Sequence, residues 1–321
     1  MKALNCVRAV VAICLLLAGT AAAQQWPSKT IRFISVGASD ALPRILGQEL
    51  SGPLGQQIII EEHAGASGTI GAEYASREPP DGYAFLIATS THMVVPHYYK
   101  LNYDIMRDFE PISLLATSPF VLISHPSLPV HNLAELVALA KKKPGQLYFS
   151  ATSAGSSSDL IMEMFKAQAR VNIVHVPYKS MAAALVDVIA GQVQLGSSVG
   201  PTVAGQLGAH KLRALAVSTP KRSIVLPDIP TYGEAGYPKV VGTAWFGLMA
   251  PRGTPAPIIS RMNAELVKAL HKPDVREKVL RLVFEPVGDT PREFRAFMQE
   301  DFMRWADAAK AANVDVSALK H

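Results

Sequence analysis

Cysteine is almost absent from this chain of 321 residues, and its two cysteines, Cys6 and Cys14, both lie within the first 23 residues. If that segment is removed on export, the rest of the chain has no means of forming a disulfide, an iron–sulfur cluster or a thiolate metal site. The composition is 49% hydrophobic and 18% charged, which is typical of a globular protein. A chain of this length can bury a large core without such cross-links.

Positive charge is also scarce. The formal net charge is 31 − 26 = +5, and no basic run is longer than Lys141–Lys143. Nucleic-acid binding needs a basic stripe or patch, so this class of partner is disfavoured. The nine histidines are scattered without the paired spacing of a metal site, and no phosphate-binding Lys-Ser/Thr motif occurs. We therefore expect no metal and no cofactor.

Long apolar runs are missing as well. Ala9–Gly19 is an apolar run that is too short to span a bilayer. It follows the basic residues Lys2 and Arg8 and precedes Ala21–Ala23, which has the small-x-small pattern of a cleavage site. This order is typical of a secretory signal peptide. We expect cleavage after Ala23, which leaves 321 − 23 = 298 residues of a soluble exported protein.

From residue 31 onward, short apolar runs alternate with segments of helical periodicity. Ile31–Val36 is predicted to be a strand and residues 40–54 a helix, and the alternation continues to residue 218. A Pro- and Gly-rich connection, 219–242, leads to one more strand at Thr243–Ala250 and a helical tail. This order predicts parallel sheets with helices on both faces, and two smaller sheets fit the length better than one.

Two short patterns mark helix starts within this alternation. Asn132 is followed by Glu135, and Thr290 by Glu293, each at the spacing of a capping box. The fourth strand is expected at Phe120–Ser124, and a helix at Ser157–Ala169. His175 is expected to be a core histidine, because it lies in an apolar strand. Trp245 and Phe246 are expected in the core, with a place in the cleft lining as the alternative.

Five loops rich in Gly, Ser and Thr follow predicted strands at their carboxyl ends. They are Gly37–Asp40, Gly65–Gly71, Thr89–His92, Ser150–Ser158 and Gly196–Gly200. In open α/β sheets these strand ends line the ligand crevice, and the helices that follow present free N–H groups to an anion. The alternative is that they are ordinary turn and cap residues.

These loops contain neither Arg nor Lys, and Lys179 lies close to one turn only. An anion bound there would be held by neutral N–H and O–H donors. Such donors favour a carboxylate over a highly charged phosphate.

An enzymatic interpretation competes with this one. Gly196–Gly200 fits the G-x-S-x-G pattern of a serine hydrolase, and Ser198, Asp228 and His271 occur in the matching chain order. No oxyanion-hole segment accompanies the pattern, and His271 lies at the end of a predicted amphipathic helix. An exported serine esterase acting through Ser198 is therefore retained only as a third hypothesis.

Several short motifs occur in a fixed order along almost the whole mature chain. They are Trp26-Pro27-Ser28-Lys29, His63 to Ala72, Pro79 to Tyr83, Asp108 to Pro111, His175 to Lys179, Lys211 to Ala216, Pro227 to Thr231 and Trp245 to Leu248. In their order and spacing the chain resembles the extracytoplasmic solute receptors of tripartite tricarboxylate transporters, also called the Bug family.

The resemblance implies an α/β periplasmic-binding-protein fold of the two-domain, Venus flytrap kind, similar to type II. After the signal peptide at 1–23, domain 1 would comprise 24–124 plus 243–321, and domain 2 would comprise 125–242. The chain would cross between them near Phe120–Ser124 and return near Thr243–Ala250. It also implies a periplasmic, monomeric, non-enzymatic protein that presents a small carboxylate to integral-membrane transporter subunits. A ligand-sensing subunit for a membrane signalling protein is the alternative.

The family's binding loops map onto the same five loops, at 37–40, 65–71, 89–92, 153–157 and 197–198, and Tyr178 lies within a family motif. The expected ligand-binding residues are therefore Ser39, Asp40, Ser67, Gly68, Thr69, Thr89, Ser90, Thr91, Ser153, Ala154, Gly155, Ser156, Ser157, Tyr178, Ser197 and Ser198. No catalytic or metal-binding residue is expected.

The chain departs from the family's pattern at three places. Its first loop, Ser35–Asp40, is shorter by about four residues, Ser180 replaces a glycine, and Gln194 stands where an aspartate is usual. The shorter loop leaves space for a bulkier ligand such as an aromatic carboxylate, beside the di- and tricarboxylates usual in the family. Loss of the receptor function is the other consequence that we considered.

Overall fold

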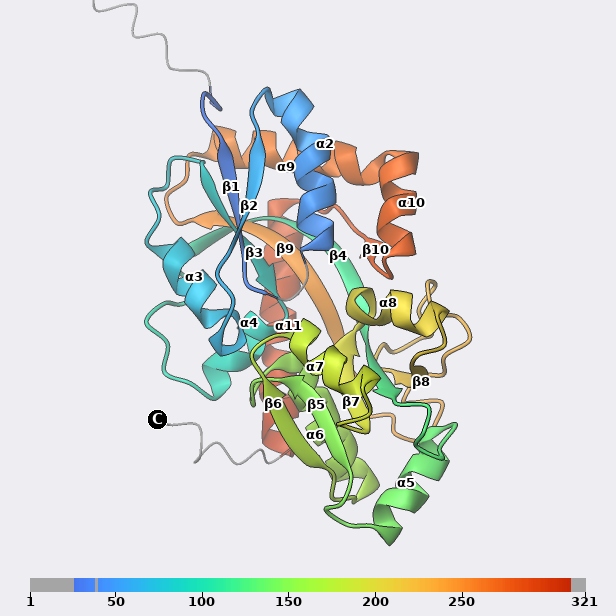
Figure 1. The fold of residues 1–321 in the computed structure, drawn as a ribbon. Coiled ribbons are helices and arrows are strands. Elements are labelled where there is room, and N and C mark those ends of the chain that lie inside the picture. The colour runs from blue at the N-terminus through green and yellow to red at the C-terminus, as the bar shows by residue number, and fades with distance from the viewer. Residues whose placement is uncertain (1–25, 38–39, 313–321) are drawn as a thin grey trace, which may run out of the picture.

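The computed structural model describes residues 26–37 and 40–312, whose strands form two sheets joined by one long strand (Figure 1). The strands are β1 Ile31–Ser35, β2 Ile58–Glu62, β3 Ala84–Thr89, β4 Phe109–Ser124, β5 Tyr148–Thr152, β6 Val174–Tyr178, β7 Leu195–Val199, β8 Arg213–Val217, β9 Thr243–Pro251 and β10 Glu285–Pro286.

Helices follow most of these strands. They are α2 Ala41–Leu54, α3 Thr69–Ser76, α4 Thr91–Val94, α5 Leu133–Lys142, α6 Ser157–Ala169, α7 Met181–Ile189, α8 Gly200–Gly208, α9 Ala256–His271, α10 Pro273–Arg281 and α11 Pro291–Ala312, with short 3₁₀ turns η2 Ala66–Gly68 and η3 Val95–His97. No helix in the described ranges is long and apolar enough to cross a membrane. The segment preceding residue 26, which includes the predicted signal peptide, lies outside the described residues.

Strand β4 belongs to both sheets. Its first part, Phe109–Pro119, pairs with β9, and Phe120–Ser124 pairs with β7 on one side and β8 on the other. We call the half around β2, β1, β3, β9 and β10 the first lobe, and the half around β8, β7, β5 and β6 the second lobe. The two-lobed α/β architecture agrees with the predicted fold class. The residue bounds of the two predicted domains stay a prediction.

The sheets are mixed rather than parallel, which corrects the sequence-based expectation. β1 is parallel to β2 and β3, and β5 is parallel to β6 and β7. β9 is antiparallel to both β3 and β4. The reason is topological, since β4 leaves the first lobe and β9 returns to it, so the two strands run in opposite directions.

Three apolar layers cover the sheets. One face of the first-lobe sheet packs against α2, α9 and α10, and the apolar layer beneath β4, α4 and α6 continues from one lobe into the other under α11. The outer face of the second-lobe sheet packs against α7 and α8. Helix α11 is tied to β9 by its own buried Asp301. The Oδ2 of Asp301 accepts hydrogen bonds from Trp245 Nε1 of β9 (2.7 Å) and from Trp305 Nε1 of α11 (3.0 Å).

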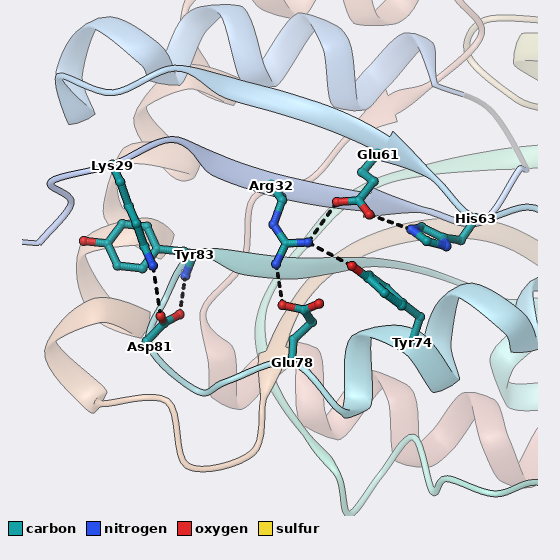
Figure 2. A network of polar contacts seen from close by, with 8 residues as sticks. All are labelled: Lys29, Arg32, Glu61, His63, Tyr74, Glu78, Asp81 and Tyr83. Carbon is teal, nitrogen blue, oxygen red and sulfur yellow. Dashed lines mark hydrogen bonds and ion pairs between the residues drawn. The ribbon is translucent and has the colours of Figure 1, made fainter.

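A polar network ties the outer strands of the first lobe to helix α3 (Figure 2). Arg32 of β1 donates to Glu61 of β2 (2.9 Å) and to Tyr74 of α3 (3.1 Å), and it pairs with Glu78 beyond the helix. His63 completes the network, since its Nε2 lies 2.7 Å from Glu61 and its ring stacks on Tyr74. One guanidinium therefore compensates two partly buried carboxylates.

Replacing Arg32 by Met is expected to lower the free energy of unfolding by about 1–2 kcal/mol, because Glu61 and Glu78 lose their common charge-assisted donor. Arg77→Met is the matched control. Its guanidinium pairs with Glu73 at 72% exposure, so a change below about 0.5 kcal/mol is expected. Urea denaturation measures both, and equal losses in the two variants would contradict the assignment.

Candidate functional site

A cavity lies between the two lobes. Loops at strand ends of both lobes and the two strands that cross between them form its walls. The lining residues are Val36, Gly37, Gly65, Ser67, Gly68, Thr89, Ser90, Thr91, Phe120, Thr152, Ser157, Lys179, Met181, Val199, Ala244, Trp245 and Phe246.

The loop between β2 and α3 has an unusual backbone. Gly65, Ala66, Ser67 and Gly68 all have positive φ, at 129°, 44°, 58° and 85°. Positive φ is costly for Ala and Ser, so this loop holds local strain of the kind found at ligand sites. The Oγ of Ser67 is buried at the cavity and has no hydrogen-bond partner among the described residues. A ligand oxygen there would satisfy a hydroxyl that otherwise costs about 1–3 kcal/mol.

A neutral histidine fixes this loop in place. His92 is fully buried; its Nδ1 accepts from the backbone N–H of Thr89 (3.0 Å), which leaves Nε2 to donate to the carbonyl of Gly68 (3.3 Å). Burial lowers the pKa of His92, so the ring stays neutral and keeps this tautomer. The loops after β2 and β3 are thereby held together.

Hydroxyl groups join the lobes across the cavity. Ser157, at the start of α6, lies 2.8 Å from Thr91 Oγ1 and 3.2 Å from Ser90 Oγ, both in the first lobe. Tyr99 of the first lobe donates to the carbonyl of Ala154 (2.6 Å) in the second. The structure is thus a closed arrangement, with polar contacts between the lobes beside the cavity.

The crossing strands contribute an apolar wall. Phe120 of β4 and Trp245 and Phe246 of β9 line the cavity together with Met181 and Val199 of the second lobe. The indole N–H of Trp245 is occupied by Asp301, so Trp245 offers its ring alone to the cavity. This wall has no polar side chain.

Charge in the lining is confined to Lys179, which follows β6. Its ammonium group forms no ion pair within the described part of the chain, and none of the described lining residues is acidic. The cavity is therefore suited to an anion. No group of His, Cys, Asp and Glu able to hold a metal occurs among residues 26–37 and 40–312.

The structure brings six of the residues predicted from sequence to this cavity, namely Ser67, Gly68, Thr89, Ser90, Thr91 and Ser157. The others, apart from Ser39, which is outside the described residues, do not line it: Asp40, Thr69, Ser153, Ala154, Gly155, Ser156, Tyr178, Ser197 and Ser198. Thr69 and Ser153 instead line a neighbouring surface pocket beside Tyr99.

Structural tasks account for most of the residues that do not line the cavity. Asp40 accepts from Ser35 and pairs with Arg44. Ser156 is fully buried and caps α6 by accepting from the backbone N–H of Asp159 (3.3 Å). Tyr178 donates to Asp187, on the α7 side of the sheet.

The loop of Ala154 and Gly155 supports the contact between the lobes. The rings of Tyr98 and Tyr99 lie so close that a Cβ at Gly155 would stand 3.0–3.2 Å from them.

The esterase geometry is not formed. Ser198 lies within β7, buried beside β4, and its Oγ has no hydrogen-bond partner among the described residues. His271 is exposed on α9 in the other lobe, where its Nδ1 lies 2.7 Å from the carbonyl of Val267. Asp228 is exposed in the connection before β9. These three residues make no triad.

Sequence reasoning gave little weight to the cation, and for Trp245 and Phe246 it favoured the core over the cleft lining. Both residues are buried in the core and also line the cavity. Their position at the start of the strand predicted to return between the lobes is the signal for the second role. Lys179 immediately precedes Ser180, the N-cap of α7, so it stands between a strand and a helix as the five predicted loops do.

Together, two lobes joined by crossing strands around an anion-suited cavity define the class of two-lobed solute-binding proteins. Residues 42–314 match the family described as the tripartite tricarboxylate transporter family receptor, and the chain belongs to this family. It is similar to the protein BugT of Bordetella pertussis, with 32% identity over 312 residues that cover 94% of this chain and 96% of BugT.

Solved structures agree. Rpa4515 of R. palustris, determined with adipate, is 33% identical and has a TM-score of 0.87. The match covers 90% of this chain and 99% of Rpa4515. MatC of Rhodopseudomonas palustris, determined with bound malate, is 29% identical with a TM-score of 0.83, over 88% of this chain and 99% of MatC. The family is one of transporter receptors, which agrees with the prediction that this chain is no enzyme.

A buried Asp–His pair lies behind the cavity in the second lobe. Asp159 Oδ1 is 3.1 Å from His175 Nδ1, and its Oδ2 accepts from the backbone N–H of Gly155 (2.9 Å). Burial raises the pKa of Asp159 to about 7 and lowers the pKa of His175 to about 4. Between these values the folded pair holds one proton, on the carboxyl group.

The two opposite shifts are expected to cancel in the wild type. Between about pH 4 and 6.5 the unfolded chain also holds one proton on this pair, on the histidine, so the pair contributes no pH dependence to stability. Asp159→Asn leaves only the histidine with a lowered pKa, so stability relative to wild type should fall as pH falls from 6.5 to 4. His175→Asn leaves only the raised carboxyl, so relative stability should fall as pH rises from 4 to 7.

Urea denaturation at half-unit pH steps measures these slopes, each of at most about 1.4 kcal/mol per pH unit. The double variant is the control and should restore the wild-type slope. Parallel curves for both single variants would show that the pair does not share a proton in this way.

Proposed function

We propose that this chain is an exported receptor that captures a small carboxylate in the cavity between its lobes and presents it to the integral-membrane subunits of a tripartite tricarboxylate-type transporter. The observation that carries the proposal is the composition of the cavity lining, which combines hydroxyl groups, strained backbone and one lysine without an acidic side chain among the described residues. Membership of the receptor family and the adipate and malate held by two similar proteins support it.

The proposed binding residues are the cavity hydroxyls, above all Ser67 with its unpaired Oγ, and Lys179. The contacts of Ser157 with Ser90 and Thr91 are proposed to hold the closed form around the ligand. Because these hydroxyl contacts are polar, they are readily replaced by water, which suits a receptor that must open to release its ligand.

Carboxylates are expected to raise the melting temperature of the protein, since a ligand at 100 times its Kd stabilises by about 2.7 kcal/mol. Ser67→Ala should weaken binding about tenfold, because a hydrogen bond to a charged group is lost. Ser260→Ala, at an exposed position of α9, is the matched control and should bind normally. Calorimetry measures both variants. A panel of aliphatic and aromatic carboxylates that gives no shift would contradict the proposed function.

Export to the periplasm is proposed from residues outside the described ranges, namely Lys2, Arg8, Ala9–Gly19 and Ala21–Ala23. Intact-mass measurement on a periplasmic extract is expected to find a chain that begins at Gln24. A chain that retains Met1 in that fraction would overturn the cleavage site.

A further inference from the structure

We propose that the cavity selects a carboxylate that carries one charge and an apolar body, and that Lys179 is the residue which supplies the opposing charge. This inference rests on the proposed function and narrows its ligand class. It follows from three features of the lining, namely the number of cations, the engagement of the hydroxyls and the chemistry of the far wall.

The first feature is the charge count. Lys179 is the one charged residue in the described lining, and its ammonium group has no acidic partner within the described part of the chain. One carboxylate is thus compensated by one cation. Lys179 is itself exposed at the rim of this space. A second carboxylate would enter the space between the lobes without a counter-charge, and removing an unpaired ion from water is costly.

The second feature is that the cavity hydroxyls are mostly engaged with the protein. Ser90 and Thr91 contact Ser157, and Thr152 Oγ1 lies 3.2 Å from Ser158 Oγ. Thr89 Oγ1 lies 3.3 Å from His92 Nδ1. Ser67 is the hydroxyl of the lining that is buried and unpaired among the described residues. Among the hydroxyls of the described lining, Ser67 therefore offers the one prepared position, on the strained loop of the first lobe.

The third feature is the far wall. Phe120 and Val199 have no hydrogen-bonding side-chain atom, Met181 has only a weakly accepting thioether, and Phe246 adds a second ring. Trp245 could donate through its indole N–H, but that group is held by Asp301 at 2.7 Å. A polar group on the ligand would lose its water here without gaining a partner, whereas a ring or alkyl chain would bury favourably at about 25 cal/mol per Å².

Matched pairs of acids isolate the second charge. Hexanoate and adipate have the same six-carbon chain, and benzoate and terephthalate have the same ring, so each pair differs by one carboxylate. Calorimetry on the wild-type protein is expected to show the monoacid binding at least tenfold more tightly in each pair. Diacids that bind as tightly as the monoacids, or more tightly, would overturn the inference while leaving the proposed function intact. If none of the four acids and no other carboxylate binds, the proposed function itself fails.

Variants at Lys179 test its role as the opposing charge. Lys179→Met is expected to weaken benzoate binding about tenfold to a hundredfold and to abolish the preference for benzoate over the neutral benzamide. Lys179→Arg retains the charge and should retain most of that preference. Lys141→Met, at an exposed position on α5, is the control and should leave binding unchanged. A benzoate preference that survives in Lys179→Met would show that another group supplies the charge.

Discussion

The hydrogen-bonded ladder between β4 and β9 is the constraint on which both lobes and the cavity depend. β4 leaves the first lobe at Pro119 and continues without interruption into the second-lobe sheet, and β9 returns alongside it from Thr243. A continuous strand holds the two sheets at a defined distance and orientation, so the loops at their strand ends face one another. The cavity exists because this ladder joins the lobes at one side and leaves the other side to polar contacts.

The same ladder determines the chemistry of the cavity. Phe120 of β4 and Trp245 of β9 belong to the core beneath α11 and present apolar surface to the cavity. Polar character is left to the loops, where the strained segment around Ser67 and the cross-lobe hydroxyl of Ser157 lie. The hydroxyls of Ser90, Thr91 and Ser157 both line the cavity and form contacts between the lobes. Closure of the lobes is therefore coupled to ligand binding.

Local patterns in the sequence predicted much of the fold. Helix α6 occurs at the residues predicted, and the capping boxes are confirmed by hydrogen bonds between Asn132 and Glu135 and between Thr290 and Glu293. The predicted strand Phe120–Ser124 was too short, because β4 begins at Phe109. Pro111 and Pro119 lie within β4, and proline usually interrupts a strand. These signals are local, whereas the crossing of β4 depends on its partners.

The loops of the site were easier to predict than the direction of their side chains. Ser156 and Ser157 are neighbours in sequence, yet Ser156 turns inward to cap α6 while Ser157 reaches the first lobe. The residue at which α6 begins decides which serine faces the cavity, and a count of serines in the loop does not reveal that residue. Lys179 was undervalued for a similar reason, since only the approach of the lobes brings it to the loops after β2 and β3.

The pairing of β3 with β9 has a consequence for the order of folding. Leu86 lies opposite Met249, 249 − 86 = 163 residues further along the chain, and Figure 1 shows these strands side by side although their colours come from opposite parts of the bar. Strands β5 to β8, by contrast, come from one continuous stretch. Non-local pairing is slow because a long loop must close first. The sheet of the first lobe therefore needs β9, from late in the chain, to cover the edge of β3.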